Sequence, residues 1–369
     1  MLVYVHVPFC ARRCSYCDFS IAVRRETPSA AFADAFEREW TLRLAHPAWA
    51  ESSRVETIYF GGGTPSRLDP TALLRVISAI AATRSVDPGA EITLEANPDD
   101  VTPERVAAWV SAGVNRVSLG AQSFDPGVLA WMHRTHTADQ IALAVRSLRQ
   151  GGIGNVSLDL IYALPEFLRR DWGRDLGEAL ALTPEHLSLY GLTVEGGTPL
   201  GKWTARGAVD ALPGESAAGQ YLRATAELGA AGFEHYEVSN AARPGRRAVH
   251  NAGYWRRVAF LGFGPSAHSG AGVRRWWNIR EWEAYRRAVE RGEDPVGGCE
   301  TLTDDQQLLE QRYLGLRTDS GVPLELVPEP YRARWQAEGW ATLDAGRVRL
   351  TPEGWLRLDA LVATLPSGS

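Results

Sequence analysis

Short apolar runs alternate with amphipathic stretches along the first 235 residues of the chain. The runs with strand character are 2–7, 57–60, 91–96, 116–120, 155–161 and 186–192. The stretches between and after them have the apolar spacing of helices and occupy 29–45, 70–84, 103–112, 137–150, 171–182 and 214–231. Asp69-Pro70 and Thr102-Pro103 each place a capping side chain before a proline, which is typical of a helix start. The alternation predicts a parallel sheet with right-handed crossovers.

Six strand–helix units are fewer than the eight of a closed barrel, so we expect an α/β fold built on an open, partial (β/α)6 barrel over residues 1–235. A connecting region follows at 236–299, rich in Gly and Trp and with strand-like pieces. The pattern changes again over 300–369. It predicts helices at 304–316, 329–339 and 352–364 and a hairpin around 343–346. This last part resembles a small winged-helix-like α+β domain.

Charge argues against a nucleic-acid partner for that last part. Residues 300–369 contain 7 Arg and no Lys against 11 Asp and Glu, and the whole chain has a net charge of −5. A DNA-binding face needs basic residues, so a structural lid or a docking surface is the better interpretation. No apolar run approaches the length of a membrane helix, and no signal peptide is evident. We expect a cytoplasmic protein, and peripheral association with a membrane stays open.

Three of the four cysteines are clustered directly after the first predicted strand. Cys10, Cys14 and Cys17 follow in a CxxxCxxC spacing, whereas Cys299 is isolated. Clustered thiols in a reducing compartment indicate a metal or cluster site, and three thiolates suit a [4Fe-4S] cluster with one iron left open. A zinc site without a nearby fourth ligand, or chance clustering, is the alternative.

The neighbouring residues are more specific than the cysteines alone. The segment YVHVPFCARRCSYCDF resembles the cluster loop of the radical S-adenosylmethionine (SAM) superfamily, and FGGGTP at 60–65 resembles its second hallmark. The resemblance implies that SAM chelates the open iron. It also implies that Gly62, Gly63 and Thr64 bind the amino group of SAM and that Tyr16 lies against the adenine. Standing alone, the glycine run would be read as a tight turn.

Polar residues at other strand ends fit the same template. The resemblance implies that Glu95, Gln122 and Asp159 contact the nucleoside or methionine portions of SAM and that Arg134 pairs with its carboxylate. We also expect Tyr4, on the first strand, to be a cofactor-binding residue. The alternative is that the buried acids are structural hydrogen-bonding groups, which is the more common case for any one of them.

A later motif indicates the branch of the superfamily. His250-Asn-Ala-Gly-Tyr-Trp255, followed by FLGFGPSAHS at 260–269, is similar to the HNxxYW motif of heme chaperones in the coproporphyrinogen oxidase-like branch. The resemblance implies that His250 binds heme and that the heme passes to an acceptor protein. The surrounding residues suit a porphyrin, with aromatic rings for its face and guanidinium groups for its propionates. These residues are Arg243, Arg246, Arg247, Tyr254, Trp255, Arg256, Arg257, Arg274, Arg275, Trp276 and Trp277. Alternatively, they are ordinary core and surface residues.

Two departures separate the chain from the oxygen-independent coproporphyrinogen oxidases. Phe19 occupies the position of their additional cysteine, and their longer N-terminal extension is missing. We therefore expect no coproporphyrinogen oxidation. Radical chemistry on a porphyrin, by decarboxylation or by methylation and opening of heme, is the first alternative, and modification of a nucleic acid is the second. Ala163 stands where the family usually has glycine. The acceptor, SAM cleavage, the oligomeric state and the roles of His268 and Cys299 stay open.

Overall fold

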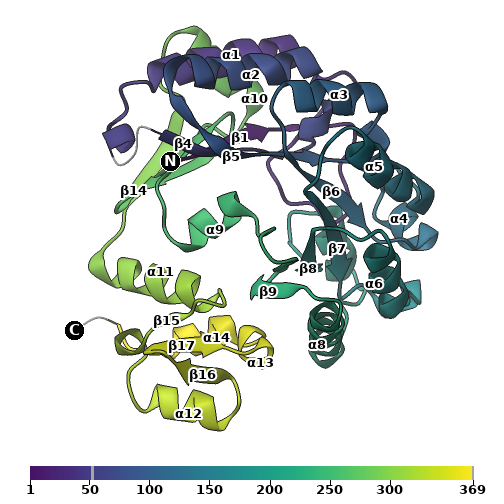
Figure 1. Cartoon of the computed structure of the whole chain (residues 1–369), viewed down its shortest axis with the longest axis vertical. Helices are drawn as coiled ribbons and strands as arrows, with labels where there is room; N and C mark the ends of the chain where they lie inside the picture. Colours follow the sequence, from purple (N-terminus) through teal and green to yellow (C-terminus); the bar gives the residue numbers. More distant parts are fainter. Residues whose placement is uncertain (51–53, 368–369) are drawn as a thin grey trace.

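The computed structural model describes residues 1–50 and 54–367 and contains one large twisted sheet (Figure 1). Its strand order is β14-β13-β12-β11-β1-β4-β5-β6-β7-β8-β10-β9. The six consecutive strands from β1 to β8 in this order are parallel, and they confirm the predicted (β/α)6 arrangement. These strands are β1 (Leu2–Val7), β4 (Arg54–Gly62), β5 (Ser85–Ala96), β6 (Arg116–Gln122), β7 (Val156–Tyr162) and β8 (His186–Gly191).

Helices cover the convex face of this sheet, in the positions that the amphipathic stretches predict (Figure 1). They are α1 (Ser29–Leu42), α2 (Pro70–Thr83), α3 (Pro103–Ser111), α5 (Ala138–Gln150), α6 (Trp172–Ala181) and α8 (Gly214–Ala230). The predicted caps form, because the side chains of Asp69 and Thr102 accept hydrogen bonds from the first turns of α2 and α3. Two short helices, α4 (Pro126–Trp131) and α7 (Pro199–Ala205), were not predicted, since neither is long enough to show a periodic pattern.

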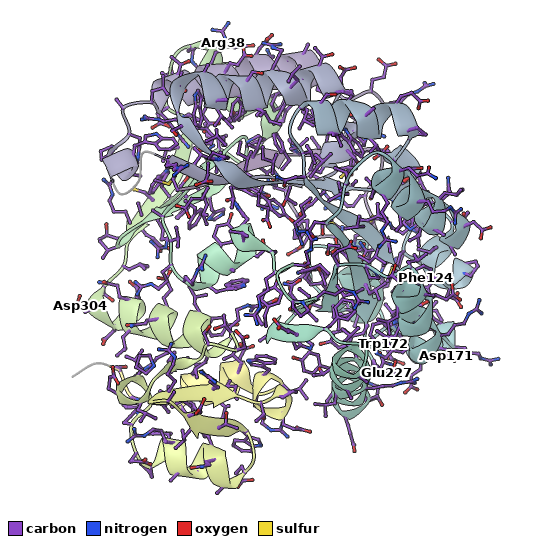
Figure 2. All side chains as sticks on the ribbon, viewed as in Figure 1. Arg38, Phe124, Asp171, Trp172, Glu227 and Asp304 are labelled. Atoms are coloured by element: carbon purple, nitrogen blue, oxygen red, sulfur yellow. The ribbon has the colours of Figure 1, made fainter. Side chains whose placement is uncertain are left out.

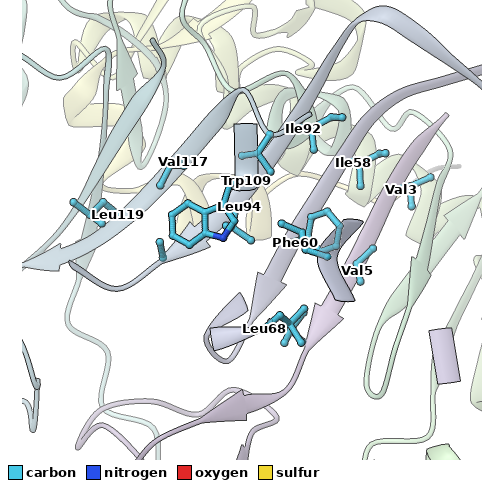
Figure 3. Packing of buried hydrophobic residues seen from close by; sticks show 14 of the residues in the cluster. Val3, Val5, Ile58, Phe60, Leu68, Ile92, Leu94, Trp109, Val117 and Leu119 are labelled. Atoms are coloured by element: carbon cyan, nitrogen blue, oxygen red, sulfur yellow. The ribbon is translucent and has the colours of Figure 1, made fainter. Parts of the chain in front are cut away.

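The core lies between the sheet and these helices, and Figure 3 shows part of its packing along the strands. Alternate residues of β1 point in opposite directions, so Val3, Val5 and Val7 are buried against the helices. Tyr4 and His6 therefore face the concave side. The face of the sheet that the helices cover also contributes Ile58, Phe60, Ile92, Leu94, Val117 and Leu119, which pack with Leu68 and Trp109. Each such buried side chain stabilises the fold by about 2 kcal/mol. The concave side is left for polar and functional groups.

The region 236–299 continues the same sheet. β11 (Phe260–Phe263) pairs in parallel with β1, and β12 (His268–Ala271), β13 (Arg274–Asn278) and β14 (Val296–Thr301) follow as antiparallel strands. β10 (Asn240–Ala242) and β9 (Glu234–Glu237) extend the other end beyond β8. α9 (Val249–Trp255) lies on the concave side, between the sheet and α11, and α10 (Trp282–Glu290) packs against α1 (Figure 1).

The C-terminal part packs in a second hydrophobic cluster around Trp335, Trp355 and Leu361, which also includes Tyr221 of α8. It starts with α11 (Asp304–Leu316), whose first turn lies on the outer edge of the molecule (Figure 2). The remaining elements are β15 (Val322–Pro323), α12 (Tyr331–Ala337), β16 (Ala341–Asp344), β17 (Arg347–Leu350), α13 (Pro352–Trp355) and α14 (Leu358–Ala363). The helix predicted at 352–364 is thus two helices, because the backbone of Arg357 leaves helical geometry at φ −114°. Residues 368–369 of the predicted domain lie outside the described residues.

Short elements complete the chain. β2 (Phe9–Cys10) and β3 (Ala22–Val23) form a two-stranded parallel sheet at the end of β1. Single 3-10 turns lie at Pro47–Ala50, Pro65–Arg67, Pro98–Asp100, Glu166–Leu168 and Leu324–Leu326. Among the described residues, no helix is both long and apolar enough to cross a membrane.

Candidate functional site

The three clustered cysteines lie at the carboxyl end of the barrel strands: Cys10 ends β2, and Cys14 and Cys17 lie on the loop between β2 and β3. Cys10 is buried and Cys14 and Cys17 are half-buried, and all three line one cavity of about 440 Å³. We call it the cluster cavity. Polar groups already point at the sulfurs: the Thr64 hydroxyl donates to Cys10 Sγ at 3.4 Å, and Arg134 Nη1 donates to Cys14 Sγ at 3.7 Å. Such donors stabilise thiolates, which are the form that binds iron.

The arrangement of the thiols fits an iron–sulfur cluster better than a zinc ion. In the part of the chain that the structure describes, no three His, Cys, Asp or Glu side chains are grouped closely enough to hold one metal ion. A structural zinc needs four ligands around a single point, whereas a cubane distributes its thiolates over separate irons. Burial raises the pKa of Cys10, and it raises the pKa of Cys17 to about 11, so both are thiols until a metal takes the place of the proton.

The glycine run at the end of β4 is required by the close approach of β1. A Cβ on Gly62 would lie 2.6 Å from the His6 ring, and one on Gly63 would lie 2.7 Å from the Pro8 carbonyl group. Gly62 also has a φ of 114°, which disfavours any other residue. The amide of Gly62 donates to Glu95 Oε2 at 3.0 Å, and that of Gly63 donates to the Val7 carbonyl at 2.8 Å. These amides are therefore engaged, which suits an ammonium group as ligand, since an ammonium needs acceptors only.

Two carboxylic acids face the cluster cavity from β5 and β7. Glu95 accepts from the Tyr59 hydroxyl at 2.8 Å through the oxygen that Gly62 does not use. Asp159 accepts from the Ser118 hydroxyl at 3.0 and 3.2 Å. Burial raises the pKa of Glu95 to about 7 against the opposing effect of the Tyr59 hydrogen bond, and burial also raises the pKa of Asp159. Both acids are thus poised to gain from a cationic ligand.

Arg134 enters the cluster cavity with part of its guanidinium unsatisfied. Its Nη2 donates to Asn97 Oδ1 at 2.6 Å and to the Gly120 carbonyl at 2.8 Å, while its Nε is buried without a partner. An orphaned buried donor fits the carboxylate of a ligand such as SAM. Gln122, which lines the same cavity, has a φ of 68° at an irregular point in the pairing of β6 with β7. Strained backbone of this kind occurs preferentially at binding sites.

The structure therefore brings together most of the residues predicted for the cluster and for SAM. The cluster cavity is lined by Cys10, Cys14, Tyr16, Cys17, Gly62, Gly63, Thr64, Glu95, Gln122, Arg134 and Asp159. Tyr4 instead lines a neighbouring cavity. Sequence reasoning missed Asn97, His133 and Tyr190, which also line the cluster cavity. Asn97 directly follows β5, Tyr190 lies near the end of β8, and His133 precedes Arg134 in the sequence. These positions at strand ends and beside a predicted site residue are the signal that would have found them.

The neighbouring cavity has a volume of about 520 Å³ and lies between the concave face of the sheet and α11. We call it the arginine cavity. It shares Phe19, Gly62 and Glu95 with the cluster cavity. Its other walls include the side chains of Tyr4, His6, Tyr254, Trp255, Arg257, Phe260, His268, Arg275, Glu310 and Leu314. Of the arginines and aromatic residues predicted to surround a porphyrin, Tyr254, Trp255, Arg257 and Arg275 line it, while Trp276 is buried in the core.

His250 lies one hydrogen bond behind the wall of the arginine cavity. Its Nδ1 is 2.6 Å from the Thr57 hydroxyl and its Nε2 is 2.7 Å from the Tyr254 hydroxyl. Burial lowers the pKa of His250 to about 3, so the ring is neutral. The carboxylate of Glu91 accepts from the backbone amides of Val249 and His250 and so caps α9 from β5. The histidine of the motif is therefore fixed on both sides, with Tyr254 between it and the cavity.

Comparison with known proteins places this geometry in a family. Residues 4–178 match the radical SAM superfamily. A heme chaperone HemW of Mycobacterium tuberculosis is 38% identical, over 98% of this chain and 94% of its own length. A radical S-adenosyl methionine domain-containing protein 1 from the mitochondria of Bos taurus is 36% identical, over 99% of this chain and 87% of its own.

The fold has a solved counterpart. The coproporphyrinogen III oxidase HemN of Escherichia coli, a radical SAM enzyme, superposes with a TM-score of 0.79 at 22% identity, covering 98% of this chain and 89% of that one. A [4Fe-4S] cluster and SAM are the cofactors of this superfamily, and the cluster cavity has the residues to hold both. The chain belongs to the HemW family of heme chaperones within the radical SAM superfamily.

Proposed function

We propose that this protein binds heme beside a SAM-ligated [4Fe-4S] cluster and delivers the heme to an acceptor protein. Relatives at 31–38% identity over most of the chain are named as heme chaperones. A cluster held by three free thiols suits the reducing cytosol, which is where we place this activity.

The arginine cavity is the observation that carries the proposal. Its volume of about 520 Å³ lies within the roughly 300–1,000 Å³ of small-molecule pockets. Its walls combine aromatic rings with two guanidinium groups and two imidazoles, which suit the face, the propionates and the iron of heme. Glu95 and Gly62 separate it from the cluster cavity, so heme would lie next to the SAM site.

We further propose that heme binding depends on His250. The contact of its Nε2 with the Tyr254 hydroxyl fixes the Tyr254 ring, which forms part of the cavity wall. Replacing His250 by alanine removes that support and leaves the Thr57 hydroxyl in a buried gap. Heme affinity should therefore fall, while the cluster, whose ligands lie on a separate loop, should be retained.

Anaerobic reconstitution followed by heme titration tests the proposal. The wild-type protein should bind about one heme per chain with a Soret band typical of histidine ligation. His250→Ala should bind heme more weakly with unchanged iron and sulfide content. Failure of the wild-type protein to bind heme above a nonspecific control protein would refute the chaperone function and leave the superfamily membership intact.

The control for His250→Ala is a second buried histidine in a matching setting. His186 has its Nδ1 2.8 Å from the Ser157 hydroxyl and its Nε2 2.7 Å from the Tyr236 hydroxyl. It lines neither the cluster cavity nor the arginine cavity. His186→Ala should therefore destabilise the fold as much as His250→Ala does, with heme affinity per folded molecule unchanged.

A further inference from the structure

Glu310 closes the arginine cavity with a carboxylate placed between two arginines. It projects from α11, and its oxygens accept from Arg257 Nε at 2.9 Å and from Arg275 Nη2 at 2.7 Å. The three side chains are between 18% and 29% exposed, so the group is accessible from solvent. One carboxylate is thus shared by two guanidinium groups, each of which has the geometry to bind a carboxylate of its own.

His268, at the start of β12, faces the same cavity with a free imidazole. Among the hydrogen bonds of residues 1–50 and 54–367, none involves the ring of His268, whose only ring contact is stacking on Trp277 at 5.8 Å. The two other histidines near the cavity are engaged. His6 contacts the Tyr4 hydroxyl at 3.1 Å and the Ser20 carbonyl at 3.0 Å, and both nitrogens of His250 face hydroxyl groups.

Backbone strain lies at this cavity as well. Arg257 has a φ of 60° and Ser266 a φ of 63°, although neither is glycine, and both line the arginine cavity. The left-handed conformation costs about 1–2 kcal/mol at each such residue. Strain that the surrounding structure maintains at a cavity wall is typical of a site that positions a ligand.

We propose that the arginine cavity holds heme with His268 as the axial ligand of the iron and with Arg257 and Arg275 bound to the propionates, which displace Glu310. This assignment rests on the proposed heme function. In the empty protein Glu310 substitutes for a propionate and keeps the two arginines in place. On binding, the imidazole of His268 would replace a water on the iron, the propionates would take the guanidinium donors, and the Glu310 carboxylate would move into solvent. His250 is a positioning residue that acts through Tyr254.

The aromatic side chains of the cavity fit the same orientation. Phe19 is 60% exposed at the boundary with the cluster cavity, which is unusual for a large apolar side chain, and Phe260 and Trp255 line the interior. A porphyrin between them would cover these rings. Phe19 replaces the additional cysteine of the decarboxylating enzymes, so the position supplies an apolar contact surface in place of a thiol.

Heme titration of variants, followed by absorption spectroscopy, tests the assignment. His268→Ala should lower heme affinity about tenfold or more and shift the Soret band, with the cluster content unchanged. His250→Ala and Tyr254→Phe should lower affinity without moving the band, because the ligand to the iron is retained. A band that shifts in His250→Ala and not in His268→Ala would overturn the assignment while leaving heme binding, and hence the proposed function, in place.

The control for His268→Ala is His46→Ala. His46 stacks on Trp276 at 4.8 Å, the residue next to Trp277 on β13, and adjacent residues of a strand face opposite sides of the sheet. His46→Ala should leave the band and the affinity unchanged.

The displacement of Glu310 by the propionates is tested separately. Glu310→Gln should raise heme affinity several-fold, since the competing charge is gone, whereas Arg275→Gln should lower it. Equal affinity in wild-type and Glu310→Gln proteins would overturn the displacement step. A surface acid on the same helix, Asp304, provides the matched variant Asp304→Asn, which should have no effect.

Discussion

Both cavities are lined by non-glycine residues whose backbone is left-handed. Gln122 and His133 line the cluster cavity, and Arg257 and Ser266 line the arginine cavity, all with φ between 60° and 68°. The sequence offered no sign of these conformations, because none of the four residues is glycine. It did offer one at Ala163, where the family usually has glycine, and the structure gives that residue a φ of 58°.

Ala163→Gly should stabilise the protein by about 1 kcal/mol, because the strain of an L-residue in this conformation exceeds the entropy that glycine adds to the unfolded chain. Denaturant unfolding measures the difference. Ala107→Gly, at an exposed position within α3, is the control and should destabilise by about 1 kcal/mol. Destabilisation by both substitutions would contradict the strain argument.

Glu95 should make stability depend on pH. Its folded-state pKa of about 7 lies above the roughly 4.3 of an unfolded chain, so the folded state retains a proton that the unfolded state releases. The contribution of Glu95 to the free energy of unfolding is therefore complete below about pH 4 and is lost as the pH rises to about 7. We expect this loss to be about 2 kcal/mol, because the carboxyl faces a cavity and is partly screened. Glu95→Gln removes this loss. In unfolding experiments from pH 4 to 8, the advantage of Glu95→Gln over the wild type should grow with pH, and a constant difference would count against the raised pKa.

The cluster should require Cys10, Cys14 and Cys17 and not Cys299. The first three line one cavity, whereas Cys299 is exposed on β14. Each Cys→Ala change among the first three should abolish the charge-transfer absorbance of the anaerobically reconstituted protein, and Cys299→Ala should leave iron content unchanged. Loss of the cluster in Cys299→Ala would mean that no iron is left open for SAM.

Contacts between distant elements fix the positions of β11 to β14, which the strand–helix alternation in the sequence did not predict. A network that is buried except at Asp294 joins α1 to β13, to α10 and to the loop after α10. Glu39 accepts from Tyr285 at 2.6 Å and from Asn278 at 2.7 Å, and Arg43 lies 2.9 Å from both Glu39 and Asp294. Except for the Arg43–Glu39 pair within α1, these contacts join residues that are more than 200 positions apart in the sequence. The six barrel strands and their helices could be predicted, because each has its own period. The partners of β11 to β14 could not, because long-range polar contacts have no local pattern.

Arg43→Leu should destabilise the protein by about 3–5 kcal/mol, because it leaves the Glu39 carboxylate buried without its cation. Adding Glu39→Gln should recover part of that loss, and equilibrium unfolding of the two single variants and the double variant measures the coupling. Arg75→Ala is the control: Arg75 of α2 pairs at the surface with Asp34 and Glu37 of α1, and its loss should cost less than about 1 kcal/mol. Equal costs at Arg43 and Arg75 would contradict the role given to burial.

At the scale of the whole molecule, this chain shares its fold with the coproporphyrinogen III oxidase HemN. The likeness to HemN covers 98% of the chain, so the fold does not decide the chemistry. The cavities do. Their outline could be predicted at the cluster, where motifs name the residues. Four residues of the arginine cavity are among those that the sequence predicts around a porphyrin. Its outline could not be predicted, because its walls come from β1, α9, β11, β12, β13 and α11, and only the folded chain brings them together.

We expect no turnover of coproporphyrinogen, because Phe19 takes the position of the additional cysteine of those enzymes. Reconstituted protein would be incubated with SAM, a reductant and coproporphyrinogen, and the products would be separated. HemN under the same conditions is the positive control. Formation of protoporphyrinogen over many turnovers would restore an enzymatic reading.

Glu310 belongs to the C-terminal part, yet its partners Arg257 and Arg275 belong to the sheet side of the molecule. Free energies around a closed cycle do not depend on the order of the steps. An anionic ligand of the two arginines weakens the attachment of α11 by some factor. A protein that binds the released α11 must then raise the affinity for that ligand by the same factor. Such a protein would distinguish a ligand-bound chain from an empty one without contacting the ligand. While it is bound to α11, Glu310 would compete less well with the ligand for the two arginines.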